Sequence, residues 1–333
     1  MTLSRRSLLA AGALSVAAPA VSGALSRGAA AQAARWQFAT PYPDANFHTR
    51  NIHAFLDDLR ERTGGRVNPQ LHTNGALLPM AQIKRGVQQR QVQLGEILLS
   101  AYGNEDPFFE VDGIPQLVAD YPQARRLADL AKPYIEARLQ RQGLSLLYTV
   151  PWPPGGFYTN APLTSIEGLR GTRFRTFNVM TNRFATLVGA SPALVQAAEV
   201  PQAFATGVVN AMVTSAATGV DSAAWDYAKV FTPIGFTLTR NVVIVSRRDL
   251  DALSAADRDA LRAAAAAAEE RGWRLSAETA ATTQNTLAQR GLTIAEASPA
   301  LREGMARISA TMTEEWVGRA GEDGRALIAA FRA

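Results

Sequence analysis

The sequence predicts an α/β fold built from two domains. Predicted strands alternate with predicted helices along residues 35–150, and a second series of alternating strands and helices follows along 172–246. A segment rich in Pro, Gly and aromatic residues, 152–158, separates the two series and is predicted to carry the chain from one domain to the other. Strands that alternate with helices indicate a largely parallel sheet.

The first 33 residues are predicted to be an export signal that is not part of the fold. A twin-arginine motif at residues 4–9 precedes an apolar stretch that runs to about Val21, and small residues suit cleavage at Ala33. Gly12 and Pro19 interrupt the apolar stretch, which is shorter than the ~20 residues of a membrane span. The sequence therefore predicts a periplasmic protein, with an uncleaved anchor as the alternative.

The composition limits the possible partners and chemistry. Cleavage at Ala33 would leave 300 residues, about two domains at ~150 residues each, and would lower the formal charge from +5 to +2. The arginines are scattered along the chain, so we exclude a nucleic-acid partner. Because the chain has no cysteine, disulfides, a thiol nucleophile and thiolate metal ligands are excluded as well.

The first series of elements begins directly after the predicted signal. Residues 35–40 are predicted to form a strand because Trp36 and Phe38 alternate with polar residues, and 46–62 are predicted to form an amphipathic helix that ends before Gly64. The other predicted elements of this series are the strands 67–73, 94–100 and 144–150 and the helices 80–90 and 122–142.

The second series ends in one long helix. Its predicted strands are 172–176, 193–196, 208–214 and 241–246, and its shorter predicted helices are 181–188 and 201–206. Ser254 and Asp257 resemble a capping box at the start of a helix over 254–290. Such a helix would span about 54 Å, more than the ~30 Å of a small domain, so we expect it to bridge both domains. A break at Gly272 into two helices is the alternative.

A short strand near the middle of the chain carries the strongest binding signal. Gly171 forms a turn, after which Arg173 and Arg175 fall on one face of the strand 172–176 and Phe174 on the other. An arginine held by a rigid strand suits the capture of an anion, while an ordinary solvated surface arginine is the alternative.

Motifs of catalysis are absent from the sequence. His48 and His53 are about 140° apart around a helix and share no face for a metal ion. The sequence has no Gly-x-Ser-x-Gly elbow, no Gly-x-Gly-x-x-Gly turn and no phosphate-binding loop with its lysine. We therefore predict no enzyme, no catalytic residue, no cofactor and no metal ion.

Seven short motifs follow one another along almost the whole chain after the signal. They are Pro-Tyr-Pro-Asp-Ala-Asn-Phe-His at 41–48, Thr-Gly-Gly-Arg-Val at 63–67, Ile-Lys-Arg-Gly-Val-Gln at 83–88, Asn-Glu-Asp-Pro at 104–107, Trp-Pro-Pro at 152–154, the strand segment 169–175, and Ala-Thr-Gly-Val-Val-Asn-Ala at 205–211. Their order resembles the solute-binding subunits of TRAP (tripartite ATP-independent periplasmic) transporters. The Gly-Val-Val-Asn-Ala and Gly-x-Arg-Phe-Arg segments are together the most specific.

The resemblance implies a two-lobe periplasmic-binding-protein-like fold, with a ligand cleft between the lobes and a long helix across both. Residues 34–157 and about 241–280 would form lobe I, and residues 158–240 and about 281–333 would form lobe II. It also implies that Arg175 pairs with the carboxylate of the ligand, because a planar guanidinium binds a carboxylate through two hydrogen bonds. Arg173 is then expected to be a solvated bystander.

Two departures from the family pattern weaken the transfer of a known specificity. Asn210 stands where relatives commonly have Asp, and residues 212–215 replace a frequent Glu-Asn-Pro. Gly155 stands where relatives with the Trp-Pro-Pro signature often have Gln, which would leave room in the cleft. Neither a sialic-acid nor a C4-dicarboxylate specificity is therefore carried over.

Further candidate ligand contacts lie near the predicted crossing and at strand ends. Three aromatic residues could form a wall of the ligand site or, equally, the packed core of the hinge: Trp152, Phe157 and Tyr158. Asn178 could donate a hydrogen bond to the ligand carboxylate or cap the next helix. Thr214 and Ser215 end a strand, where ligands of open α/β sheets bind. Weaker candidates, each also explained by packing or a turn, are Phe47, Asn74, Tyr102 and Trp225. The region of Trp225 and Asp226 also stays open as a ligand wall, a dimer surface or a metal-assisted contact.

The predicted function is the capture of a small organic acid and its delivery to the membrane subunits of a TRAP transporter. A mono-, 2-oxo- or 2-hydroxycarboxylate is the expected ligand, and an apolar or aromatic body and a homodimer are left open. The alternatives are an exported lyase or isomerase on the same two-lobe scaffold and a ligand-sensing partner of a membrane receptor.

Overall fold

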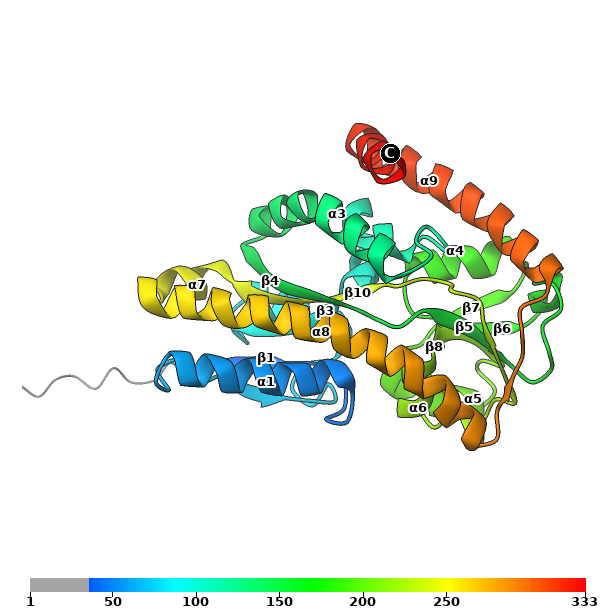
Figure 1. Cartoon of the computed structure of the whole chain (residues 1–333), viewed down its shortest axis with the longest axis horizontal. Coiled ribbons are helices and arrows are strands. Elements are labelled where there is room, and N and C mark those ends of the chain that lie inside the picture. Colours follow the sequence, from blue (N-terminus) through cyan, green and yellow to red (C-terminus); the bar gives the residue numbers. More distant parts are fainter. Residues whose placement is uncertain (1–35) are drawn as a thin grey trace, which may run out of the picture. The chain divides into compact units, whose positions relative to one another are not determined.

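The computed structural model describes residues 36–333. The predicted signal, residues 1–33, lies outside the described residues. Two β-sheets, each with helices on both faces, form the described part of the chain (Figure 1). The prediction of an α/β fold is confirmed. In residues 36–333, no helix combines the length and the apolar character that a bilayer crossing requires.

The first sheet combines early strands with one strand from much later in the chain. Its strands, in spatial order, are β2 (Gln70–His72), β1 (Gln37–Ala39), β3 (Leu94–Leu98), β10 (Arg240–Ser246) and β4 (Leu144–Pro151). β1 runs parallel to β2 and β3, while β10 lies antiparallel between β3 and β4. The sheet is therefore mixed, and the expectation of a largely parallel sheet is wrong at β10.

Helices cover both faces of the first sheet, so its strands are apolar on both sides. One face packs against α1 (Phe47–Arg62) and α8 (Ala255–Gln289), and the other against α2 (Met80–Gln88) and α3 (Tyr121–Arg141). Side chains of β10 alternate between the two cores: Val243 and Val245 join the first, and Val242 and Ile244 join the second. This alternation explains why the strand is a continuous apolar run.

The second sheet is also mixed. Its strands, in spatial order, are β11 (Thr293–Ile294), β9 (Val230–Pro233), β5 (Gly155–Thr159), β8 (Ala211–Ser215), β6 (Arg173–Thr176) and β7 (Ser191–Leu194). Its covering helices are α4 (Val179–Leu187), α5 (Val200–Ala205), α6 (Ala216–Asp221) and α9 (Pro299–Arg332). β5 runs antiparallel to β8 and β9, so the parallel prediction also fails here. Phe157 of β5 packs toward α4 and α9, and its neighbour Tyr158 packs on the opposite face.

The long helix α8 is continuous and contacts both sheets (Figure 1). It packs on α1 and β4 of the first sheet and on α6 and β11 of the second, which confirms the predicted bridge. Gly272 does not break it. A Cβ at this position would come within 2.3 Å of a Val150 methyl group and 2.8 Å of Asn51 Nδ2, so the glycine allows α8 to approach β4 and α1 closely.

The chain crosses between the sheets at points that differ slightly from the prediction. The segment 152–158 was expected to be irregular, but β5 begins at Gly155, so the irregular crossing is Trp152-Pro153-Pro154. The predicted lobe boundary after residue 157 therefore falls inside a strand of the second sheet. The chain returns to the first sheet through residues 234–239. Shorter elements are α7 (Arg247–Ala252) and the 3₁₀ helices Leu99–Tyr102, Pro107–Gly113, Ile166–Leu169, Ala197–Glu199 and Ala224–Asp226.

Candidate functional site

A cavity lies between the two sheets and is lined by residues from both. It encloses about 570 Å³ of space not filled by atoms, a figure that includes the solvent at its open mouth. Its lining consists of Tyr42, Met80, Leu98, Trp152, Pro153, Gly155, Arg175, Phe177, Gln196, Ala197, Val213, Thr214, Ser215, Thr218, Phe236, Thr237 and Thr239. Several of these side chains follow strand ends, which is where ligands bind in open α/β sheets.

Arg175 is the one charged side chain in this lining. It is 3% exposed, and its Nε donates to the carbonyl oxygen of Val195 at 2.9 Å. Its guanidinium carbon lies 4.9 Å from the ring centre of Phe177. Among residues 36–333, no carboxylate comes within 4 Å of this guanidinium, and burial lowers its pKa to about 10. The site therefore holds a buried positive charge that a ligand anion can pair with.

Two other arginines, Arg173 and Arg240, differ from Arg175 in exposure or in partner. Arg173, on the same strand, is exposed and donates to the carbonyl oxygen of Gly207 at 2.6 Å. Arg240 is as buried as Arg175, but its Nε donates to Asp112 Oδ2 at 2.8 Å. Exposure therefore separates Arg173 from Arg175, and the carboxylate partner Asp112 separates Arg240 from it.

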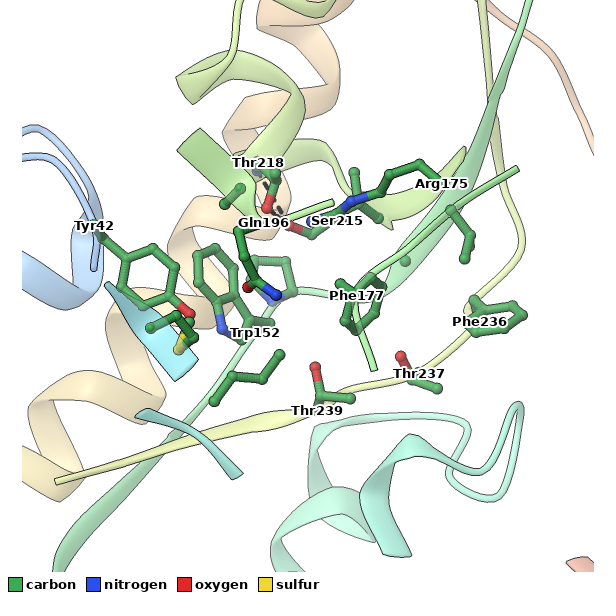
Figure 2. A pocket seen from close by; sticks show the side chains of 17 residues that line it. Tyr42, Trp152, Arg175, Phe177, Gln196, Ser215, Thr218, Phe236, Thr237 and Thr239 are labelled. Atoms are coloured by element: carbon green, nitrogen blue, oxygen red, sulfur yellow. Dashed lines mark hydrogen bonds between the residues drawn. The ribbon is translucent and has the colours of Figure 1, made fainter. Parts of the chain in front are cut away.

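An aromatic wall stands at one end of the cavity. Trp152 is 8% exposed, and its ring meets that of Tyr42 edge-on with 5.1 Å between centres. Figure 2 shows these two rings together, with Arg175 and Phe177 further along the cavity. Aromatic surfaces and one cation thus meet in the same space, an arrangement that can hold a flat, apolar body with one acidic group.

Hydroxyl and amide groups supply the remaining polar surface. Thr237 and Thr239 belong to the returning crossing, and their hydroxyl oxygens point into the cavity in Figure 2. Gln196 lies between Trp152 and Phe177 in the same view. These groups can donate to, or accept from, polar atoms of a ligand.

Four of the residues predicted from sequence line the cavity. They are Arg175, Trp152, Thr214 and Ser215. Ser215 also caps α6, because its Oγ accepts from the backbone N–H of Thr218 at 3.2 Å. The hydroxyl of Ser215 is therefore partly committed to the fold.

Three predicted aromatic residues pack behind the cavity. Phe157 lies in a cluster with Phe174, Phe184 and Phe236, of which Phe236 lines the cavity. Tyr158 is fully buried and donates to the carbonyl oxygen of Ser215 at 3.1 Å. The third, Phe47, is buried against the ring of Trp152 with 5.4 Å between centres and supports the wall from behind.

The other predicted residues have roles in the fold or lie in neighbouring hollows. Asn178 caps α4 by accepting from Thr181 N at 2.8 Å. The Tyr102 hydroxyl donates to the Met80 carbonyl oxygen at 2.8 Å. Asn74 lines a separate hollow beside Trp152. Trp225 lies 5.2 Å from the guanidinium of Arg290, away from the cavity, and its neighbour Asp226 belongs to the same turn. Within residues 36–333, no three His, Cys, Asp or Glu side chains gather as a metal site would require.

Sequence reasoning missed several lining residues. These are Tyr42, Phe177, Gln196, Thr218, Thr237 and Thr239. Tyr42 belongs to the first of the quoted motifs, and the alternation of Thr237 and Thr239 just before a predicted strand was a usable signal. The others come together only through the packing of distant segments.

Hydrogen bonds join the two sheets at two places around the cavity. The Nδ2 of Asn46, the capping residue of α1, donates to Asp221 Oδ2 at 2.6 Å. The Nδ2 of Asn178 donates to the Ser100 hydroxyl at 2.9 Å. In each asparagine the side-chain oxygen caps a helix, while the amide nitrogen donates to a residue on the other side of the cavity. These hydrogen bonds connect the two sides of the cavity.

Comparison with known proteins gives consistent similarities. Residues 38–318 match the family described as bacterial extracellular solute-binding protein, family 7. A curated solute-binding protein of Albidiferax ferrireducens is 22% identical over 193 residues, which are 57% of this chain and 56% of that protein, so the chain matches little more than half of its length.

Solved structures resemble the chain over nearly their entire length. Two extracytoplasmic solute receptors of Bordetella pertussis that bind pyroglutamic acid, DctP6 and DctP7, are 39% and 41% identical, each with a TM-score of 0.88 and coverage of 90% of this chain and 99% of theirs. A TRAP solute-binding protein specific for pyroglutamate, from an unidentified microbe of a marine metagenome, is 34% identical with a TM-score of 0.89 and the same coverage.

Proposed function

The chain belongs to the bacterial extracellular solute-binding proteins of family 7, and we propose from this premise that it captures pyroglutamate for a TRAP transporter. One observation carries the proposal: the cavity between the sheets contains the buried guanidinium of Arg175, which pairs with no carboxylate of residues 36–333. The three solved relatives that bind pyroglutamate support this choice of ligand.

Family membership confirms the predicted role as an extracytoplasmic solute-binding protein. It decides against an exported lyase or isomerase and favours transport over ligand sensing, because the matched proteins are solute receptors. TRAP membrane subunits are the partner that the family implies. Export by the twin-arginine route and a homodimer stay predictions.

Pyroglutamate matches the chemistry of the cavity group by group. It carries one carboxylate, one lactam N–H and one lactam carbonyl on a small flat ring. Arg175 is proposed to pair with the carboxylate, and Trp152 and Phe177 to cover the faces of the ring. Thr237 and Thr239 are proposed to bind the lactam atoms through their hydroxyl groups.

The same chemistry predicts discrimination against amino acids. Glutamate and proline carry an ammonium group that pyroglutamate lacks. The lining includes no Asp or Glu that could pair with this group. An unpaired buried charge costs several kcal/mol, so the zwitterions should bind far more weakly than the lactam monoanion.

We propose that ligand capture is coupled to closure of the two sheets over the cavity. Residues on both sides line the site, so a ligand that contacts both stabilises the closed arrangement. The bridges from Asn46 and Asn178 would form only in that arrangement. The sheets, linked by two crossings and α8, would act as the two lobes that the sequence predicted.

The proposal is tested by titrating the purified protein with pyroglutamate, glutamate, proline and succinate in a calorimeter. Pyroglutamate should bind with a single site, and the other three should bind at least about a hundredfold more weakly. The variant Arg175→Ala should lose pyroglutamate binding, while Arg173→Ala should keep it. Tighter binding of another acid than of pyroglutamate would overturn the ligand assignment, and tight binding by Arg175→Ala would overturn the anchor.

A further inference from the structure

Behind the aromatic wall, one buried asparagine connects two segments that are far apart in sequence. The side-chain oxygen of Asn241 accepts from Trp152 Nε1 at 2.8 Å and from the Tyr42 hydroxyl at 3.3 Å. Its Nδ2 donates to Glu96 Oε1 at 3.0 Å, and Glu96 Oε2 is 2.5 Å from the Thr40 hydroxyl. All five side chains belong to strands of the first sheet or lie within three residues of a strand end.

The orientation of the Asn241 amide follows from donor chemistry. An indole N–H can only donate, so the atom that faces Trp152 must be the oxygen of Asn241. The amide nitrogen then points toward Glu96, which accepts. The reversed amide would place two donors against each other at Trp152 and two acceptors against each other at Glu96. Trp152 as a donor and Glu96 as an acceptor therefore favour the same orientation of Asn241.

Asn241 is itself rigidly held and does not line the cavity. It is 1% exposed and sits in the central strand β10, paired with Leu98 of β3 and Val150 of β4. Trp152, which it holds, follows β4 by one residue, and Tyr42 lies shortly after β1. A fixed point in the sheet thus sets the position of two rings that do line the cavity.

We propose that Asn241 is a positioning residue for the ligand, with Glu96 as the group that orients it. Asn241 acts through Trp152 and Tyr42, whose side chains it holds at the wall before the ligand arrives. The effect on affinity rests on the proposed binding of pyroglutamate at this wall. The effect on the rings themselves does not, and it can be measured without a ligand.

The charged and titratable groups around Glu96 do not replace Asn241 in this role. His48 Nδ1 lies 3.4 Å from Glu96 Oε1, on the side of α1. Burial lowers the pKa of His48 well below its usual value, which favours a neutral ring there. Among the described residues, no guanidinium or ammonium group lies within 4 Å of Glu96. The orientation of Asn241 therefore depends on the acceptor that Glu96 presents.

The experiment compares Asn241→Leu with two matched variants. Leucine keeps the branched heavy-atom skeleton of the side chain, with two slightly larger methyl groups, and removes both the acceptor and the donor. Glu96→Gln is the conservative variant, because its carbonyl can still accept from Asn241 and its amide can donate to Thr40. Asn51→Leu is the control for general destabilisation: Asn51 is buried beneath α8, donates to the Ala268 carbonyl oxygen and lies outside the cavity lining.

Two quantities are measured on the full-length protein labelled with ¹⁵N. The first is the indole N–H resonance of Trp152, assigned with Trp152→Phe, and the second is the Kd for pyroglutamate. Asn241→Leu should move the Trp152 resonance upfield and weaken binding about tenfold or more. Glu96→Gln and Asn51→Leu should leave the resonance in place and keep Kd within about threefold of wild type.

Three results would overturn the positioning role. They are an unmoved Trp152 resonance in Asn241→Leu, an unchanged Kd in that variant, and an equal loss of affinity in Asn51→Leu. If Asn241→Leu does not fold, hydrogen exchange of the wild-type protein tests the positioning role instead. The Trp152 indole N–H should exchange slowly before the ligand is added. Rapid exchange would show that Trp152 is not held in place in the free protein. If wild type does not bind pyroglutamate, the proposed function fails, and the resonance and exchange data alone judge the positioning.

Discussion

Replacing Arg175 with methionine should remove ligand binding without weakening the free protein. Burial lowers the pKa of Arg175 to about 10, which corresponds to about 3 kcal/mol spent on keeping the charge in the free protein. Methionine removes that cost and loses the hydrogen bond to Val195 and the contact with Phe177, each worth about 1 kcal/mol. The free variant should therefore melt at the wild-type temperature or a few degrees higher.

The same substitution should have a large effect on the complex. Removing one partner of a buried charge pair costs about 2–5 kcal/mol. The Kd of Arg175→Met should therefore exceed that of wild type by a factor between about 30 and several thousand. At a ligand concentration a thousand times its Kd, wild type gains about 4 kcal/mol of stability. This gain should raise its melting temperature by about 6 °C, because a chain of about 300 residues unfolds with an entropy of about 0.6 kcal/mol/K. The variant should show no such rise.

Calorimetric unfolding and titration of the same samples measure both effects, and another buried arginine provides the contrast. Arg240→Met leaves Asp112 buried without its partner, so it should destabilise the free protein by about 3–5 kcal/mol. The reasoning would be refuted if Arg175→Met lowered the melting temperature as much as Arg240→Met does. It would also be refuted if Arg175→Met bound pyroglutamate within about threefold of wild type.

Three further substitutions test the fold, the buried acid and the closure. Gly272→Ala should destabilise by about 1–3 kcal/mol in urea unfolding, because its methyl group would overlap Val150, and a more stable variant would contradict the close packing. Burial raises the pKa of Glu96 to about 7, so the folded state keeps a proton that the unfolded chain loses. Wild-type stability should therefore fall by about 2 kcal/mol between about pH 5 and 7 relative to Glu96→Gln, and parallel pH curves for the two proteins would exclude this. Asn46→Ser keeps an oxygen to cap α1 and removes the amide that donates to Asp221. Calorimetry should show that this variant binds pyroglutamate about tenfold more weakly at a nearly unchanged melting temperature. An unaltered affinity would show that the bond to Asp221 plays no part in closure.

The elements of the fold were largely predictable because their signals are local. The helix over 254–290 is found as α8 (Ala255–Gln289), and its cap at Ser254 is present. Gly272 was harder to interpret, because glycine occurs both where a helix breaks and where a helix packs closely against a neighbour. The strand β5 was hidden because Pro153 and Pro154 directly precede it and resemble a loop.

The direction of the strands could not be derived in the same way. The short apolar run at 241–246 predicts a strand, but such a run is compatible with a parallel and with an antiparallel neighbour. β10 is antiparallel because the chain re-enters the first sheet from the second through 234–239. That path is a property of the whole topology.

The sequence by itself determined the α/β class, the bridging helix and the presence of an arginine on one face of the strand at 172–176. These features depend on backbone sterics and on side-chain periods of 2 and 3.6 residues, which act over a few neighbours. The tertiary structure alone decided that Arg175 has no acidic partner among residues 36–333 and that Asn178 caps α4. It alone brought Asn241 to Trp152 and Tyr42. The physical reason is that a cavity and its buried hydrogen bonds arise where segments 100 or more residues apart pack together, and no local pattern encodes which of them meet.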